Sequence, residues 1–199
     1  SRPRRPWRTR GSALTAAVLL NRGARPRFRF SGHESFACRY AWLPKAFQAL
    51  EGKPDLFAAD ELAMLELGIG KNMVKSLRFW VEAMGVAQPW NRGRGLSLTR
   101  FATELFAANG LDPYIEDLRT QWLLHWKLSS HREGAPFAWD YLISRWLYPE
   151  FTRSEALSAF RRESERLGWT HSETTLGQHL DVFLHTYLSN RGPVVGVED

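Results

Sequence analysis

The sequence predicts a mainly helical protein, in which a winged helix-turn-helix domain is followed by a helical subdomain. Three observations support this fold class. A short glycine-containing turn joins two helical stretches, an arginine- and glycine-rich hairpin follows the second of them, and helical patterns fill the rest of the chain. We expect the domain over residues 28–110 and the subdomain over residues 111–192, between a basic arm (1–27) and a tail (193–199).

Basic residues gather in two stretches of the chain, although its net charge is only +6. Residues 1–30 hold nine arginines and no acidic residue, and residues 68–100 hold six basic residues and one acidic residue. Residues 101–199 are acidic on balance. An anion-binding surface is therefore expected in the two basic stretches. The arm, rich in proline, glycine and arginine, is expected to be disordered. It either grips phosphate or is simply solvated, and we favour the second.

Composition argues against a membrane or secreted protein. No stretch approaches the ~18 consecutive apolar residues of a membrane span. The apolar run ALTAAVLL is short and is followed by NRGARPR, where a signal peptide would have a small-residue cleavage site. A single cysteine, Cys38, excludes an internal disulfide and fits a reducing compartment. We predict a soluble, cytoplasmic protein without a membrane partner.

Two helices are expected before the first basic stretch of the domain. Pro44 suits the first turn of a helix that runs to about Leu50. DLFAADELAMLELG follows, with Asp60 and Glu61 in its first turn, where carboxylates favour the positive end of a helix. Gly68 is placed to end this second helix.

Residues 71–84 then form an amphipathic helix with a basic outer face. Drawn at ~100° per residue, its apolar arc contains Met73, Val74, Leu77, Trp80, Val81 and Met84. The rest of the wheel holds Lys71, Asn72, Lys75, Ser76, Arg78, Phe79 and Glu82. Two helices joined by a short glycine-containing turn are typical of a helix-turn-helix.

A hairpin follows, in VAQPWNRGRGLSLT. Asn91-Arg92-Gly93-Arg94-Gly95 is a turn of hairpin type, and Pro89 assigns its strand to an edge. Thr99 is placed to cap a further helix, RFATELFAA, which stops at Asn109-Gly110. This order of elements predicts the winged helix-turn-helix.

Four helices are expected in the subdomain. The first opens at Asp112-Pro113 and carries an apolar stripe, and FAWDYLISRWLYPE forms the second, ended by Pro149. Thr152 to Glu155 is a capping box that opens the third, and residues 173–189 form the fourth. The tail VVGVED could begin a strand. The stripe of the first helix consists of Ile115, Leu118, Trp122, Leu123 and Trp126.

The basic helix and the hairpin are the candidate DNA-binding surface. The first residues of a recognition helix reach base edges in the major groove, and a hairpin that contains arginine tracks the backbone or the minor groove. A solvated basic face and a turn without a ligand are the plainer alternatives. Phe79 is expected to pack on the hairpin, stack on a sugar or meet a partner. The candidate contacts are Lys71, Asn72, Lys75, Ser76, Arg78, Phe79, Arg92, Arg94 and Arg100.

Other polar clusters have structural explanations. His33 and Glu34 precede Cys38, but no second His/Cys pair at metal-ligand spacing accompanies them, so we expect a buried His33–Glu34 network at the entry to the first helix. Acidic residues between Asp112 and Asp117 fit capping and the helix dipole. No nucleophile elbow or phosphate-binding loop is present in the sequence. We predict no enzymatic activity, no cofactor and no metal; a metal-dependent nuclease is the weakest alternative.

Several stretches resemble one bacterial family, the domain of unknown function 4007. They are FSGHESFACRYAWLPKAF, ELGIGKNMVKSLRFWVEAMGV, DPYIEDLRTQWLLHWKL and, more weakly, DVFLHTYLSNRG, and the resemblance spans residues 28–192. Members tend to lie beside genes for DNA sulfur modification (phosphorothioation) and phage defence, and usually continue past the point where this sequence ends. The resemblance carries no activity with it, but it implies a role near modified DNA.

Together these observations predict a component of such a system that binds double-stranded DNA. The alternative is an adaptor that docks onto an ATPase or a DNA-modification enzyme of the system, since the acidic second half is rich in aromatic residues. The oligomeric state is left open.

Overall fold

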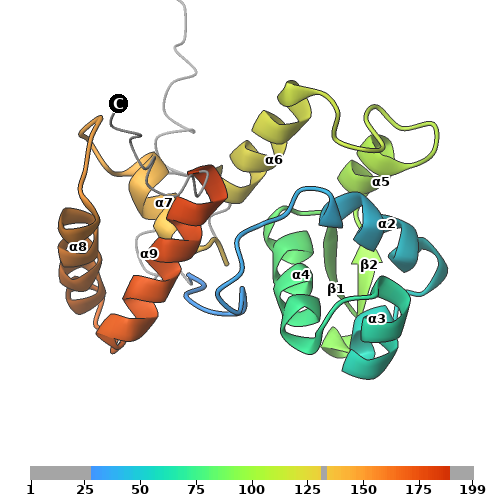
Figure 1. The fold of residues 1–199 in the computed structure, drawn as a ribbon, viewed down its shortest axis with the longest axis horizontal. Helices are drawn as coiled ribbons and strands as arrows, with labels where there is room; N and C mark the ends of the chain where they lie inside the picture. The colour runs from blue at the N-terminus through green and yellow to red at the C-terminus, as the bar shows by residue number, and fades with distance from the viewer. Residues whose placement is uncertain (1–27, 131–133, 189–199) are drawn as a thin grey trace, which may run out of the picture.

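The computed structural model describes residues 28–130 and 134–188, so the expected arm (1–27) and tail (193–199) lie outside the described residues. The protein is mainly helical, with one small antiparallel sheet (Figure 1). Within the described ranges, no helix combines the length and apolar character needed to cross a membrane. The elements are α2 (Trp42–Gly52), η1 (Leu56–Ala58), α3 (Asp60–Leu67), α4 (Lys71–Ala83), β1 (Ala87–Trp90), η2 (Asn91–Gly93), β2 (Gly95–Leu98), α5 (Arg100–Phe106), α6 (Leu118–Ser130), α7 (Phe137–Ser144), α8 (Arg153–Arg166) and α9 (Glu173–Tyr187).

Helix α4 is the central element of the first half. Leu77, Trp80 and Val81 are almost completely buried, and the Trp80 indole N–H donates to the Phe36 carbonyl at 3.2 Å. The turn that leads into α4 was predicted correctly: Gly68 ends α3 in the left-handed conformation (φ 60°), which glycine adopts at no steric cost. The apolar arc of the sequence wheel therefore does face the core.

The predicted hairpin is confirmed as the pair β1–β2. Ala87 pairs with Leu98 and Trp90 with Gly95, in antiparallel register. The Leu96 N–H donates to the Pro54 carbonyl at 2.8 Å, which fixes the start of β2 to the segment before η1. Thr99 caps α5 as expected, since its side chain accepts from the Ala102 N–H.

The second half places α7, α8 and α9 together, and α6 runs between them and the first half (Figure 1). The capping box of Thr152 and Glu155 is present at the start of α8. Helix α6 begins at Leu118 and not at Asp112, because Ile115 adopts a left-handed conformation (φ 59°) that interrupts a helix. Asp112 instead accepts from the Glu116 and Asp117 N–H groups through its carboxylate.

Residues 28–34 lie between the two halves. The Arg29 N–H donates to the Ala135 carbonyl (2.9 Å), and the Phe137 N–H donates to the Arg29 carbonyl (3.1 Å). The Phe30 ring stacks on the Phe137 ring, with 4.7 Å between centroids. The start of the described chain therefore packs on the helices of the second half, although the sequence places it in the first domain.

A buried pair of histidines completes this contact. The Ala138 N–H donates to Nε2 of His179 at 3.0 Å, and Nδ1 of His179 lies 3.0 Å from Nε2 of His33. His33 is held in turn by the Ser35 N–H, which donates to Nδ1 of His33 at 3.2 Å. Burial lowers the pKa of both rings, which therefore are neutral at pH 7. The predicted His33–Glu34 network is wrong in its partner, because Glu34 is exposed.

Candidate nucleic-acid interface

Three of the predicted contact residues lie exposed in the first turns of α4. They are Lys71, Asn72 and Lys75. Lys71 forms an exposed ion pair with Asp60 (3.3 Å), whereas Lys75 forms no hydrogen bond or ion pair with another described residue. Gly70 precedes the helix without a side-chain cap. This end of α4 thus offers two ammonium groups and free backbone N–H donors to an anion.

The turn of the hairpin presents two more arginines. Arg92 and Arg94 are both exposed, and Arg92 has a left-handed backbone (φ 58°, ψ 32°) within η2. This conformation differs from that of the neighbouring Arg94, which is right-handed (φ −72°, ψ −32°). Both side chains are available to a ligand at the tip of the hairpin.

Arg78 joins the helix to this turn. Its guanidinium donates to the Gly93 carbonyl (3.0 Å), the Phe57 carbonyl (3.3 Å) and Oε1 of Glu82 (3.1 Å). A side chain with this many partners holds the hairpin at a fixed position beside α4. These bonds give Arg78 a positioning role, and its side chain stays 33% exposed, so the predicted phosphate contact remains a prediction.

The structure corrects two of the predicted contacts, because Ser76 and Phe79 are both buried. Ser76 is 0% exposed, and its hydroxyl has no hydrogen-bond partner among the residues that the structure describes. Phe79 is 5% exposed, beneath Gly32 and with the Arg29 guanidinium 5.6 Å from its ring centroid. The sequence wheel put both on the outer face because it could not foresee that residues 28–34 return to cover α4.

Arg100 is also separated from the other contacts. It follows β2 at the end of the hairpin opposite the turn, and its exposed side chain pairs with Glu104 at 2.7 Å. The structure thus brings the exposed cations of α4 and of the hairpin turn into one region through Arg78, and leaves Arg100 outside it.

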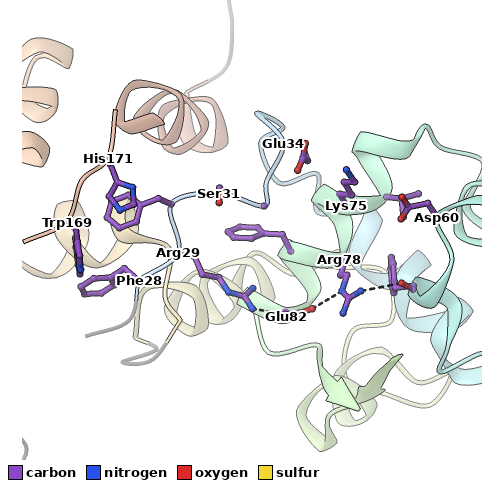
Figure 2. Close-up of a pocket in the computed structure, with 15 residues that line it drawn as sticks. Phe28, Arg29, Ser31, Glu34, Asp60, Lys75, Arg78, Glu82, Trp169 and His171 are labelled. Carbon is purple, nitrogen blue, oxygen red and sulfur yellow. Dashed lines mark hydrogen bonds and ion pairs between the residues drawn. The ribbon is translucent and has the colours of Figure 1, made fainter. Parts of the chain in front are cut away.

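A groove of about 1220 Å³ lies beside α4. Residues 28–34 form its floor, α4 and η1 line one side, and the α8–α9 connection lines the other (Figure 2). Nothing in the sequence pattern indicated this groove, because its walls come from segments far apart in the chain. Its lining residues include Phe28, Arg29, Phe30, Glu34, Asp60, Lys75, Arg78, Phe79, Glu82, Trp169 and His171.

Glu82 organises the charge at the centre of the groove. Its two carboxylate oxygens pair separately with Arg29 (2.7 Å) and Arg78 (3.1 Å), as Figure 2 shows. Glu82 is only 12% exposed in its side chain, whereas the two arginines are each about a third exposed. Two guanidinium groups that share one carboxylate leave one positive charge in surplus. Burial lowers the pKa of His171 at the other end, which keeps that ring neutral at pH 7.

Helix α6 carries a second conspicuous surface. Leu118, Trp122 and Trp126, spaced by four residues, are 63%, 64% and 59% exposed. Residues four apart lie on one face of a helix, so the three form a continuous apolar stripe in solvent. Of the predicted stripe, these three residues and Leu123 face outward, whereas Ile115 is buried ahead of the helix; Leu124 and Leu128 face the core.

The acidic and histidine clusters do not converge. Among residues 28–130 and 134–188, no three His, Cys, Asp or Glu side chains are arranged to hold a metal ion. Burial raises the pKa of the Asp112 carboxyl, but hydrogen bonds from Thr120 and from backbone N–H groups outweigh that effect and lower it. Asp112 is thus engaged in capping the turn before α6.

Comparison with known proteins identifies the class to which this chain belongs. The family model described as "Protein of unknown function (DUF4007)" matches residues 30–199, and the chain is a member of that family. Two solved structures are similar to it. One, "Magnesium ion-bound SspB crystal structure", shares 28% identity at a TM-score of 0.71, over 79% of this chain and 49% of that chain. The other, "SspB crystal structure", shares 27% identity at a TM-score of 0.70, over 80% and 50%.

The chain therefore spans about half the length of SspB. No curated protein matches it.

Proposed function

We propose that the protein binds double-stranded DNA as a winged helix-turn-helix component of a bacterial phosphorothioation-linked or anti-phage defence system. In this proposal α3 and α4 are the helix-turn-helix, α4 is the recognition helix and β1–β2 is the wing. The observation that carries the proposal is the bond from Arg78 to the Gly93 carbonyl, which ties the exposed cations of the wing to those of the recognition helix.

The exposed charges suit a duplex. Lys71 and Lys75 project near the start of α4, the part of a recognition helix that meets base edges, and Asn72 between them has the amide that pairs with adenine. Arg92 and Arg94 at the wing tip suit phosphates or a narrow minor groove. We therefore infer that sequence readout comes from α4 and that the wing sets its orientation. The link to defence and sulfur modification rests on membership of the family.

The duplex proposal predicts a change in salt dependence. The combined variant Lys71→Ala, Arg92→Ala, Arg94→Ala should lower the log–log slope of affinity against salt by about 0.9 per lost contact, or about 2.7 in all. Affinity for a random 20-base-pair duplex is measured by fluorescence anisotropy across a salt series, with the full chain. The arm is the same in both proteins, so the difference in slope isolates the α4 and wing surface.

A matched control removes the same charge elsewhere. Arg153, Arg161 and Arg162 are exposed on α8, away from α4 and the wing (Figure 1), and their triple alanine variant should keep the slope of the wild type. A triple variant at residues 71, 92 and 94 with the slope of the wild type would contradict the duplex proposal. Duplexes with and without backbone sulfur, compared at one salt concentration, test the modification preference.

The α6 stripe favours the adaptor as a second candidate function. A continuous exposed apolar patch that contains aromatic side chains is characteristic of a protein-interaction surface. Its occupant in this proposal is the ATPase or DNA-modification enzyme of the same defence system. Trp122→Glu with Trp126→Glu should abolish co-elution with that enzyme after co-expression, and Leu147→Glu, at a 90% exposed leucine elsewhere, should not. Co-elution that survives the double change rules out this surface.

A further inference from the structure

The groove beside α4 has an aromatic end and a cationic end. Figure 2 places Trp169, His171 and Phe28 at one end, Arg78 and Lys75 toward the other, and Arg29 and Glu82 between them. We propose that this groove binds one nucleotide, with the base against Trp169 and His171 and the phosphate at Arg29, Arg78 and Lys75. The site goes beyond the duplex surface, because its aromatic end belongs to the second half of the chain.

The aromatic end is rigid and partly open. The His171 ring lies on the Phe30 ring at 4.0 Å between centroids, tilted by 33°, and Trp169 meets Phe30 edge-on at 5.3 Å. Trp169 and His171 are each only partly buried, and both line the groove. Rings held from behind by other rings lose little entropy when a base stacks on them, and stacking tolerates any base.

The cationic end carries the charge of a single phosphate. Arg29 and Arg78 share Glu82, which leaves one positive charge. Lys75, one turn before Arg78 on α4, adds a second positive charge, and the carboxylate of Glu34 offsets one of the two. The charge of Asp60 is neutralised by its ion pair with Lys71. The surplus of one positive charge equals the charge of one phosphodiester. Guanidinium groups form short, charge-assisted bonds to phosphate oxygens.

This balance selects among anionic ligands. A run of several phosphates would bring more negative charge than the groove offsets, and would face the carboxylates of Glu34, Asp60 and Glu82. A nucleotide places only one phosphate here and fills the remaining length with an uncharged base. The volume of the groove, about 1220 Å³, also exceeds the ~300–1,000 Å³ of ordinary ligand sites, so a nucleotide can enter without repacking of the side chains that line it. An unpaired nucleotide of a DNA strand and a free nucleotide share the aromatic base and the single phosphate; the diester of the strand matches the surplus charge, whereas the monoester of a free nucleotide carries about −1.5 to −2 at pH 7.

Two groups of variants separate the groove from the duplex surface. The groove variants are His171→Ala and, separately, Arg29→Gln, which leaves Lys75 of the duplex surface in place; Arg29→Lys keeps the charge and serves as the rescue. The control variants are His185→Ala, at an exposed histidine of α9, and Lys71→Ala with Arg92→Ala on the duplex surface. The probes are a fluorescein-labelled single-stranded hexamer of dT, followed by anisotropy, and dTMP, followed by calorimetry, both with the full chain. Far-ultraviolet circular dichroism confirms that each variant is folded.

His171→Ala should weaken binding of the hexamer at least about fivefold, the loss expected for one base stack. Arg29→Gln should lower the salt slope for the hexamer by about 0.7, and Arg29→Lys should restore most of that loss. Binding of the hexamer alone assigns the source of the nucleotide to a DNA strand, and binding of dTMP alone assigns it to a free nucleotide. Both outcomes support the site.

Three results would overturn the proposal. The first is that neither probe binds the wild type at millimolar concentration. The second is that folded groove variants bind both probes as the wild type does. The third is that the duplex-surface control weakens binding of both probes as strongly as the groove variants do. Failure of duplex binding with intact binding of dTMP would refute the proposed function and leave the nucleotide site standing. Loss of binding of both probes, with intact duplex binding, would refute the nucleotide site and leave the proposed function standing.

Discussion

His179→Ala is expected to lower the free energy of unfolding by about 3 kcal/mol. His179 is 0% exposed, its ring accepts from the Ala138 N–H at the start of α7, and its Nδ1 lies 3.0 Å from Nε2 of His33. Removing the ring leaves a buried backbone donor without a partner and a cavity between Phe30 and Trp139. Urea denaturation followed by tryptophan fluorescence measures the change. His185→Ala, at an exposed position on the same helix, should change it by less than about 0.5 kcal/mol.

The same variant should remove part of the pH dependence of stability. The pKa values of His33 and His179 are lowered by burial in the folded state, and return to ordinary values near 6.5 on unfolding. The unfolded chain therefore binds more protons below about pH 6.5, so the contribution of the pair is complete above that pH and is lost as the pH falls. Each histidine adds up to ~1.4 kcal/mol per pH unit to the slope.

This slope is read between pH 7.5 and pH 5.5, above the usual range of carboxyl groups. The wild type should lose stability in this window more steeply than His179→Ala. Equal slopes in the two proteins would mean that the buried pair is not held neutral.

Gly95→Ala is expected to lower the free energy of unfolding by about 2 kcal/mol and to loosen the hairpin. A Cβ at this position would lie 2.6 Å from the Pro54 carbonyl oxygen and 3.2 Å from the Trp90 ring. The backbone oxygen cannot move away, because it accepts the Leu96 N–H that anchors β2. Thermal unfolding gives the loss, and amide exchange at Leu96 reports on the hairpin itself.

Gly52 offers the matched control for this change. No atom lies within 4 Å of a Cβ built on Gly52, at the end of α2, so Gly52→Ala should be neutral or slightly stabilising. A Gly95→Ala protein as stable as Gly52→Ala, with unchanged exchange at Leu96, would contradict the close approach of β2 to Pro54.

Local signals in the sequence were sufficient for most elements of the fold. Gly68, Thr99 and the Thr152–Glu155 box act within a few residues of their partners, so their roles could be inferred from spacing alone. The hairpin followed from its Arg/Gly turn and its edge proline. The predicted start of the helix at Asp112 was wrong, because the left-handed conformation of Ile115 depends on its burial and not on a local preference.

The candidate site depended on contacts that sequence spacing cannot reveal. Lys71 and Lys75 could be placed on an exposed face because that follows from helical periodicity. The burial of Phe79 could not be predicted, since the segment that covers its ring starts about fifty residues earlier in the chain. The partner of His33 lies 146 positions away, and the groove is walled by both halves. Long-range packing decided each of these outcomes, and one sequence holds no direct record of it.

The return of residues 28–34 to the second half also has a consequence for synthesis. The chain is made from its N-terminus, and His33 emerges 146 residues before His179. At about 5–20 residues per second, the ribosome needs about 7 to 30 s to supply this partner. For most of that interval Phe28 and Phe30 lack the ring of Phe137, and for nearly all of it the ring of Trp169, against which they finally pack. The segment that emerges first in the described chain is thus among the last to reach its native contacts.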